Sequence, residues 1–298
     1  MPFISTQAEQ ILAKHHTGSV SKIFLDDQQQ VSGLLIDHQT CQATISLLGG
    51  QLLTWQPNNS RPVFWLSEKA IYQPNKAIRG GVPICWPWFG SYQDGGNHGF
   101  ARQAQWQVDD INISAEQVEL TLSFNGEQCH RLWPTPFILQ QTFIFKHSLQ
   151  QQLQMTNRSA KPVLYSGALH NYFRVSGPQN VDIPTLANKP FDDKLTSGTG
   201  LRHTDVQCIG PVDRIYHTAE TMQIIDKSWR RTIELTSEHC QQWVLWNPGI
   251  EQSQQIADIH AQGEQQFICL EAANTQWQTI PAHQSRIIGQ VIKIIEYN

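Results

Sequence analysis

Apolar and polar residues alternate along most of the chain, with a period of two. The pattern is plain at Val118, Leu120, Leu122 and Phe124, which alternate with polar Glu119, Thr121 and Ser123. Such alternation over four to eight residues predicts half-buried β-strands. Residues 143–155 alternate on both sides of a polar centre and predict two strands joined by a turn. Further strands are predicted at residues 31–36, 43–55, 106–113, 222–225, 232–235, 242–246, 267–270 and 286–296.

Helical periodicity is clear only near the N-terminus, at residues 6–16. Ala8, Ile11, Leu12 and His15 would share one face of that helix, and Ser5 could cap it. Strands do not alternate with amphipathic helices, no linker or repeat divides the chain, and residues 177–210 are interpreted as a loop-rich insertion. We therefore predict one all-β domain over residues 1–298, a large antiparallel sandwich in which residues 1–20 form an N-terminal helix and lead-in.

Charge and hydropathy exclude two classes of partner. The 298 residues include 21 Lys and Arg against 25 Asp and Glu, a net charge of −4, whereas nucleic-acid and anionic-lipid surfaces need a concentrated basic face. No apolar stretch approaches the ~20 residues that span a bilayer. The first residues also lack the basic and apolar regions of a signal peptide. We expect a cytoplasmic protein that binds neither nucleic acid nor membrane.

The cysteines predict free thiols rather than a metal site or disulfides. All six stand singly, so there is no Cys-x-x-Cys pair of the kind that binds zinc or carries out thiol redox chemistry. A chain of this length does not need disulfides to be stable. We expect buried free thiols in a reducing compartment.

Residues 79–90 combine two prolines, three glycines and several aromatic side chains. Proline lacks the backbone donor that a central strand needs, so the segment is predicted to be irregular. Aromatic rings at the rim of a sheet suit a sugar platform, because they stack on the C–H faces of the sugar. An alternative that stays open is that Trp86, Trp88 and Phe89 plug one end of the sandwich.

Other segments carry groups for proton transfer and anion binding. Arg79 and Arg102 could meet in the fold, where their planar guanidinium groups would match a phosphate or carboxylate. His170 lies in a small, apolar stretch and can exchange protons near neutral pH. Glu271 ends an apolar strand, where low polarity would raise its pKa toward that of a general base. The structural alternatives are solvated arginines, a buried core histidine and an exposed strand-end glutamate.

Several catalytic motifs are absent from the sequence. It contains no P-loop, no dinucleotide-binding glycine fingerprint, no His-Glu-x-x-His and no Gly-x-Ser-x-Gly. Their absence disfavours nucleotide-driven, nicotinamide, zinc-hydrolase and serine-hydrolase chemistry. What remains suits proton transfer on a polar small molecule without a cofactor or metal.

As an ordered set, these segments resemble the aldose 1-epimerase (mutarotase) family, and within it the hexose-6-phosphate mutarotase branch. The resemblance rests on Arg79-Gly80-Gly81-Val82-Pro83 with Trp86-Pro87 and Phe89-Gly90, His98-Gly99-Phe100-Ala101-Arg102, Leu169-His170-Asn171-Tyr172-Phe173, Asp213-Arg214-Ile215-Tyr216, Trp246-Asn247-Pro248 and Glu271. It implies a galactose mutarotase-like β-supersandwich with few short helices. It also implies a monomeric isomerase that interconverts the anomers of a sugar phosphate, glucose 6-phosphate above all, without cofactor or metal.

The resemblance assigns roles position by position. His170 would be the general acid and Glu271 the general base. The predicted substrate-binding residues are Arg79, Asn97, His98, Arg102 and Asp213. Two alternatives are a mutarotase of unphosphorylated aldoses and a carbohydrate-binding protein on the same fold that has lost catalysis.

Overall fold

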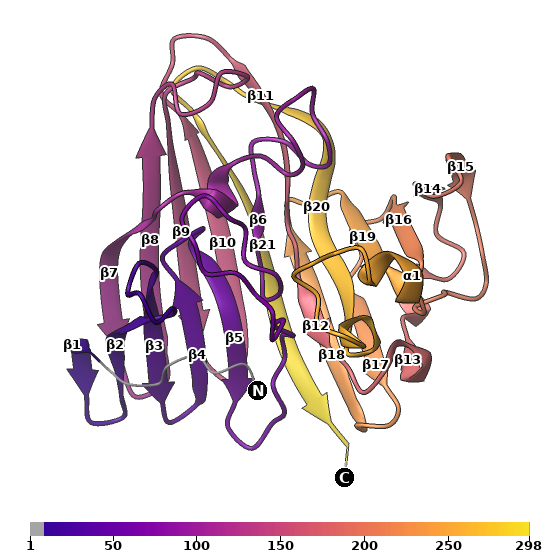
Figure 1. The fold of residues 1–298 in the computed structure, drawn as a ribbon, viewed down its shortest axis with the longest axis horizontal. Coiled ribbons are helices and arrows are strands. Elements are labelled where there is room, and N and C mark those ends of the chain that lie inside the picture. The colour runs from indigo at the N-terminus through magenta and orange to yellow at the C-terminus, as the bar shows by residue number, and fades with distance from the viewer. Residues whose placement is uncertain (1–8, 298) are drawn as a thin grey trace.

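A computed structural model describes residues 9–297, and its strands form three sheets in which every pairing between strands is antiparallel (Figure 1). The first sheet follows chain order: β1 (Gln10–His15), β2 (Gly18–Phe24), β3 (Ser32–His38), β4 (Cys41–Ser46) and β5 (Gln51–Pro57). Each of its strands pairs with the next in sequence, so hairpins alone build it.

The second sheet has eight strands in the order β13-β17-β18-β21-β10-β9-β8-β7. Their bounds are β7 (Gln107–Ile113), β8 (Val118–Gly126), β9 (Phe137–Phe145), β10 (Ser148–Asn157), β13 (Val181–Asp182), β17 (Met222–Asp226), β18 (Arg231–Glu238) and β21 (Ser285–Glu296). The alternation at residues 143–155 is thus confirmed as the hairpin of β9 and β10.

The third sheet runs in the order β15-β14-β16-β19-β20-β11-β6, and β12 also pairs with β20. Its strands are β6 (Ile84–Cys85), β11 (Val163–Leu169), β12 (Tyr172–Arg174), β14 (Phe191–Asp193), β15 (Gly198–Leu201), β16 (Val212–Tyr216), β19 (Gln242–Asn247) and β20 (Phe267–Ile280). Helix within residues 9–297 is limited to α1 (Gly249–Ser253) and the 3-10 turns η1 (Ala101–Gln103), η2 (Pro178–Asn180), η3 (Pro184–Leu186) and η4 (Gly263–Gln265).

The last two strands, β20 and β21, each run through the middle of one of the two large sheets. β20 lies between β19 and β11, and β21 lies between β18 and β10 (Figure 1). One apolar core joins all three sheets, with Ile45 from the first, Leu120 from the second and Leu270 from the third. The prediction of an all-β antiparallel fold with few short helices is confirmed.

The predicted N-terminal helix is wrong where the structure describes it. Residues 10–15 form β1, which pairs with β2 from Gln10 opposite Lys22 to His15 opposite Gly18, and residues 6–8 lie outside the described residues. Ile11 and Leu12 remain 54% and 39% exposed, so no apolar helical face meets a core. A short apolar run fits either periodicity, and here hairpin pairing decides between them.

The strand predicted over residues 43–55 is two strands. β4 and β5 are separated by a turn in which Gly49 and Gly50 have φ of 80° and 55°. A side chain at Gly49 would also approach the Arg102 carbonyl oxygen to 2.7 Å. The Gly-Gly pair therefore forms the turn that separates the two strands. The alternation of apolar and polar residues does not indicate this turn. Among the described residues, no helix is long and apolar enough to cross a bilayer.

The thiols give a simple test of the fold. All six cysteines are free, and Cys129 alone of the six is exposed. Burial raises the pKa of Cys85, Cys208, Cys240 and Cys269, which makes these thiols poor nucleophiles. We expect a disulfide-exchange reagent to modify one thiol rapidly in the native protein and about six after denaturation without reductant. Fewer than six after denaturation would contradict the unpaired assignment.

Candidate active site

The site forms where two short strands meet the middle of β20. From Gly167 onward, β11 and β12 pair with β20 in one register, with Leu169 opposite Ala272 and Tyr172 opposite Cys269. The two residues between the strands do not join this ladder: the His170 N–H donates to the Pro83 carbonyl and the Asn171 N–H to the Leu169 carbonyl. His170 therefore lies in a tight turn directly across from Glu271 of β20.

The side chains of His170 and Glu271 are in contact. His170 Nε2 lies 3.3 Å from Glu271 Oε1, and the two residues are 7% and 1% exposed. The alternation of β20 explains the orientation, because Leu270 and Ala272 point into the core and leave Glu271 on the opposite face of the sheet. Two residues 101 positions apart in sequence are thus brought into one buried pair.

Neighbouring strands extend this face of the sheet. Trp246 of β19 pairs with Cys269 of β20 and, on its other side, with Asp213 of β16. Asp213 therefore lies two strands away from β20 on the face that carries Glu271. Burial raises the pKa of the Asp213 carboxyl, and its proximity contributes to raising the pKa of Glu271.

Aromatic rings fix the plane of the His170 imidazole. The Tyr172 ring stacks on it with centroids 4.8 Å apart and planes at 8°. His98 and Trp246 meet it edge-on at centroid distances of 5.6 and 6.3 Å. Tyr172 is the first residue of β12, two positions after His170, so the turn that carries His170 also brings the two rings together.

The backbone around His98 explains the glycine that follows it. His98 has a φ of 65° and Gly99 a φ of 65°, and a side chain at Gly99 would come within 1.9 Å of the Trp86 carbonyl oxygen. The Gly90 N–H donates to His98 Nδ1 at 3.2 Å. Burial and the charges of Arg102 and Arg79 lower the pKa of His98 to about 3. His98 is therefore neutral, with its proton on Nε2, and is a hydrogen-bond donor.

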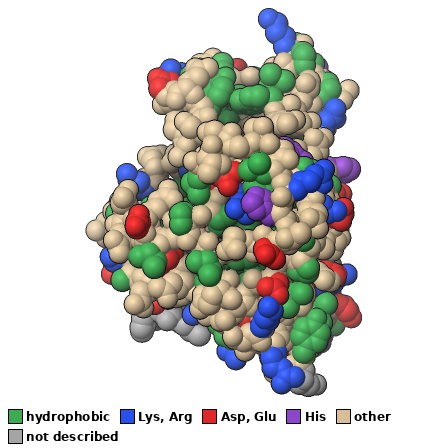
Figure 2. All heavy atoms as spheres, turned by 90° about the vertical axis from the view of Figure 1, so that its right-hand side faces the viewer, with side chains coloured by type: hydrophobic (Ala, Val, Ile, Leu, Met, Phe, Trp, Pro, Cys, Tyr) green, Lys and Arg blue, Asp and Glu red, His purple; other side chains and the backbone are tan. Residues whose placement is uncertain are grey.

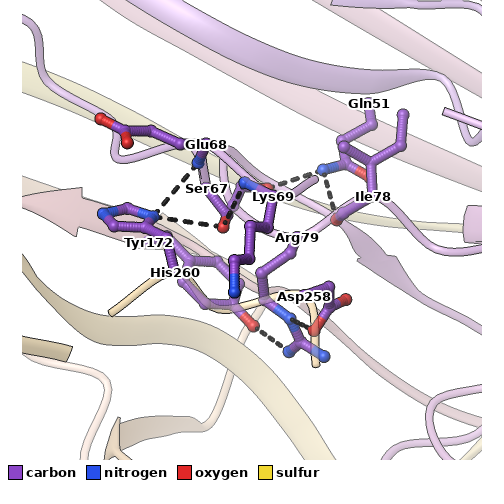
Figure 3. A network of polar contacts seen from close by, with 10 residues as sticks. Gln51, Ser67, Glu68, Lys69, Ile78, Arg79, Tyr172, Asp258 and His260 are labelled. Carbon is purple, nitrogen blue, oxygen red and sulfur yellow. Dashed lines mark hydrogen bonds and ion pairs between the residues drawn. The ribbon is translucent and has the colours of Figure 1, made fainter. Parts of the chain in front are cut away.

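The two arginines differ in how far their donors are already used. Arg79 Nε donates to Asp258 Oδ1 at 3.1 Å, and its Nη1 donates to the Tyr172 hydroxyl at 2.9 Å (Figure 3). Arg102 Nη2 donates to the Asn97 carbonyl at 2.9 Å. Its buried Nε has no hydrogen-bond partner among the described residues. Arg102 therefore has fewer hydrogen bonds to other residues than Arg79 has.

The electrostatics favour a single proton on the His170–Glu271 pair. Burial, with further contributions from His98, Arg102 and Arg79, lowers the pKa of His170 well below its usual range. Burial and Asp213 raise the pKa of Glu271 well above its usual range, and Arg102 partly offsets this. A pair with one proton is either an ion pair, with the proton on His170, or a neutral pair, with the proton on Glu271. Both shifts favour the neutral pair.

Three buried polar atoms at the site have no hydrogen-bond partner within residues 9–297. They are His170 Nδ1, Glu271 Oε2 and Arg102 Nε. Buried polar atoms are usually hydrogen-bonded, and a bound ligand is one explanation for an atom that is not. Eight other buried side-chain atoms within residues 9–297 also have no partner, so these three indicate a site only because they belong to the residues that surround the His170–Glu271 contact. On the face drawn in Figure 2, histidine, basic and acidic side chains gather at a hollow. The described residues include no group of three or more His, Cys, Asp or Glu that could hold a metal ion.

The residues predicted from sequence are placed as follows. His170 contacts both Glu271 and His98. Arg79 and Arg102 are near enough to shift the pKa of His170, and Asp213 and Arg102 that of Glu271. Asn97 is exposed, and its recorded contact to Arg102 is made by its backbone carbonyl rather than its amide. The structure thus gives no role to the Asn97 side chain.

The aromatic platform predicted at residues 79–90 is corrected in part. Trp86 and Trp88 are 1% exposed and belong to the core, so they plug the sandwich. Phe89 is partly exposed, and its ring centroid lies 5.0 Å from that of His98. Trp246 is the partly exposed tryptophan beside His170. Sequence reasoning gave no role to Tyr172 or Asp258. No pattern in the sequence near Asp258 indicates its role, because its partner Arg79 lies 179 positions away.

Comparisons with known proteins agree on one family. A family model described as aldose 1-epimerase matches residues 33–287. A protein of Salmonella typhimurium named "putative glucose-6-phosphate 1-epimerase" is 32% identical over 270 residues, covering 89% of this chain and 88% of its own. One of the same name from Escherichia coli K12 is 32% identical over 268 residues, covering 88% and 90%. The crystal structure of a Salmonella typhimurium protein titled a "putative mutarotase" matches with a TM-score of 0.88 at 30% identity, covering 98% of this chain and 97% of its own.

Proposed function

This chain belongs to the aldose 1-epimerase family, and from that premise we propose that it interconverts the α and β anomers of a hexose 6-phosphate, with glucose 6-phosphate as the preferred substrate. The observation that carries the proposal is the buried contact of 3.3 Å between His170 Nε2 and Glu271 Oε1. An imidazole and a carboxylate in this arrangement are a matched acid and base.

The geometry suits the chemistry of a cyclic hemiacetal. Its ring oxygen and its hydroxyl are both bonded to C1, so the acid and the base must present atoms that lie side by side. Deprotonated Glu271 takes the proton of the C1 hydroxyl, while protonated His170 gives a proton to the ring oxygen as the C1–O bond breaks. The open aldehyde rotates about the C1–C2 bond, and the reverse transfers close the ring as the other anomer.

The proton balance of the pair supports this cycle. Before ring opening the proton is on His170, and afterwards it is on Glu271, so the pair holds one proton throughout and its net charge does not change. The lowered pKa of His170 and the raised pKa of Glu271 favour the form with the proton on Glu271, so the form that opens the ring is the less populated one, in which His170 is a strong donor and Glu271 a strong acceptor. Burial of both side chains also keeps water from competing for the proton.

The residues around the pair have complementary roles in the proposal. Neutral His98 would donate from Nε2 to a sugar oxygen, and Asp213 would accept from sugar hydroxyls. Trp246, partly exposed beside His170, offers a ring face to the sugar. Each of these groups lies on the face of the third sheet that carries Glu271 or in the loops that cover it.

The phosphate assignment rests on the arginines. The buried Nε of Arg102 has no hydrogen-bond partner within residues 9–297. Arg79 donates to Asp258 through Nε and to Tyr172 through Nη1, which leaves its Nη2 for a phosphate oxygen. Guanidinium groups bind phosphate oxygens through paired N–H donors. The names of the relatives from Salmonella typhimurium and Escherichia coli point to the same substrate. The six free cysteines support a reducing compartment, and we propose the cytoplasm.

Magnetisation-exchange NMR on the wild-type protein tests the proposal. We expect anomer exchange faster than the spontaneous rate for glucose 6-phosphate, and a higher kcat/KM for hexose 6-phosphates than for free glucose or galactose. Faster exchange of the free sugars would favour a mutarotase of unphosphorylated aldoses instead. No acceleration for any aldose would contradict catalysis and leave the carbohydrate-binding alternative.

A further inference from the structure

A chain of buried amide side chains crosses the interior behind the His170–Glu271 pair. Gln141, Gln151, Gln290 and Asn171 are each at most 1% exposed. Gln141 donates to the Gly50 carbonyl at 2.6 Å, Gln151 donates to Gln141 at 2.6 Å, and Gln290 donates to Gln151 at 2.9 Å. The chain starts at the turn between β4 and β5 and crosses β9, β10 and β21.

The last link joins the second sheet to the third. Gln290 Nε2 donates to Asn171 Oδ1 at 2.8 Å, and Asn171 Nδ2 donates back to Gln290 Oε1 at 2.7 Å. Asn171 Nδ2 also donates to the Leu270 carbonyl at 3.0 Å. Asn171 follows His170, and Leu270 precedes Glu271. The amide pair therefore holds together the two backbone segments that carry the proposed acid and base.

The backbone ladders on either side of His170 and Glu271 leave a gap at this point within residues 9–297. The N–H groups of His170 and Asn171 bond to Pro83 and Leu169, so the β-ladder with β20 is interrupted at this point. The Asn171 side chain supplies the hydrogen bond to β20 that the backbone does not. The stability of the fold alone does not require the Asn171–Gln290 pair, because two facing amides can be replaced by apolar side chains of similar shape with little loss of stability.

We propose that Asn171 and Gln290 are positioning residues that fix the separation and alignment of His170 Nε2 and Glu271 Oε1. They touch no substrate and act through the backbone on either side. The inference rests on the proposed function in that its kinetic readout is anomer exchange. Misplacing reacting groups by about 1 Å can cost about 10²-fold in rate.

The test compares Asn171→Leu and Gln290→Met with Asn157→Leu as a matched control. Asn157 is also buried, at 1% exposure, and donates to the Ile280 carbonyl of the same strand β20 at 3.1 Å, at the end remote from Glu271. We expect kcat to fall about 10–100-fold in the first two variants with KM within about threefold of wild type. Asn157→Leu should lose stability but keep kcat within about twofold. Gln290→Met decides the outcome if Asn171→Leu does not fold.

A second readout requires no substrate. The imidazole NMR resonances of His170, identified by their loss in His170→Asn, should shift and titrate differently in Asn171→Leu and Gln290→Met but not in Asn157→Leu. This result would stand even if the wild type acted on no hexose phosphate, which separates the two proposals. Unchanged His170 resonances in both test variants would overturn the positioning role, even if kcat fell. So would a kcat equal to that of the control.

Discussion

Replacing Glu271 with glutamine is expected to lower kcat for anomer exchange by about 10²–10⁴-fold, the range that a positioned general base contributes. Glutamine has nearly the same shape but cannot accept a proton from the C1 hydroxyl. Magnetisation-exchange NMR at saturating substrate measures the loss. Glu264→Gln is the matched control, because Glu264 is also buried, at 5% exposure, and bonds to Ser253 outside the site. A Glu271→Gln variant within about threefold of wild type would rule out Glu271 as the base.

The same variant should become more stable as it loses activity. The pKa of Glu271 is raised in the folded protein, so the native state binds more protons than the unfolded state above pH ~4.3, and wild-type stability falls as the pH rises. Glutamine does not ionise and avoids that penalty. We expect the melting temperature of Glu271→Gln to exceed that of wild type at pH 8 by about 2–4 °C per kcal/mol released, with the gap closing toward pH 4. A variant less stable than wild type at pH 8 would contradict the buried, raised pKa.

Replacing Arg102 with alanine is expected to separate phosphorylated from free sugars. A hydrogen-bonded contact between charged groups contributes about 1.5–3 kcal/mol, so kcat/KM for glucose 6-phosphate should fall about 10–100-fold further than kcat/KM for free glucose. Arg102 also shifts the pKa values of His170 and Glu271, and that effect should slow both sugars alike. The differential loss therefore measures the phosphate contact.

Arg131→Ala provides the control for this comparison. Arg131 pairs with Asp94 at the surface, and its side chain is 62% exposed. Its loss removes the same charge without touching the site, so both sugars should react as with wild type. Equal losses for the two sugars in Arg102→Ala would remove the phosphate assignment and favour a mutarotase of free aldoses.

The strands were predictable because their signal is local. Alternation over a few residues identifies a half-buried strand wherever one face meets the core, as in β8 and β9. It fails where the strand is an exposed edge, as in β1, and where a glycine pair turns the chain, as at Gly49 and Gly50. Pairing order is not local at all: nothing in the sequence of β21 indicates that β18 and β10 are its neighbours.

The site was predictable only through the ordered motifs of a family. A histidine in an apolar stretch and a glutamate at a strand end each have a common structural explanation. Their contact depends on the register of β11, β12 and β20, which no single segment reveals. Asp258 and Gln290 could not be predicted as parts of the site. Each binds a partner more than 100 positions away in the sequence.

The central place of β20 and β21 has a consequence for biosynthesis. The first sheet consists of neighbouring hairpins and can form while the rest of the chain is still being translated. Both larger sheets lack a middle strand until residues 267–296 leave the ribosome. Glu271 arrives with those residues, so a nascent or C-terminally truncated polypeptide would expose two incomplete sheets and carry no acid–base pair.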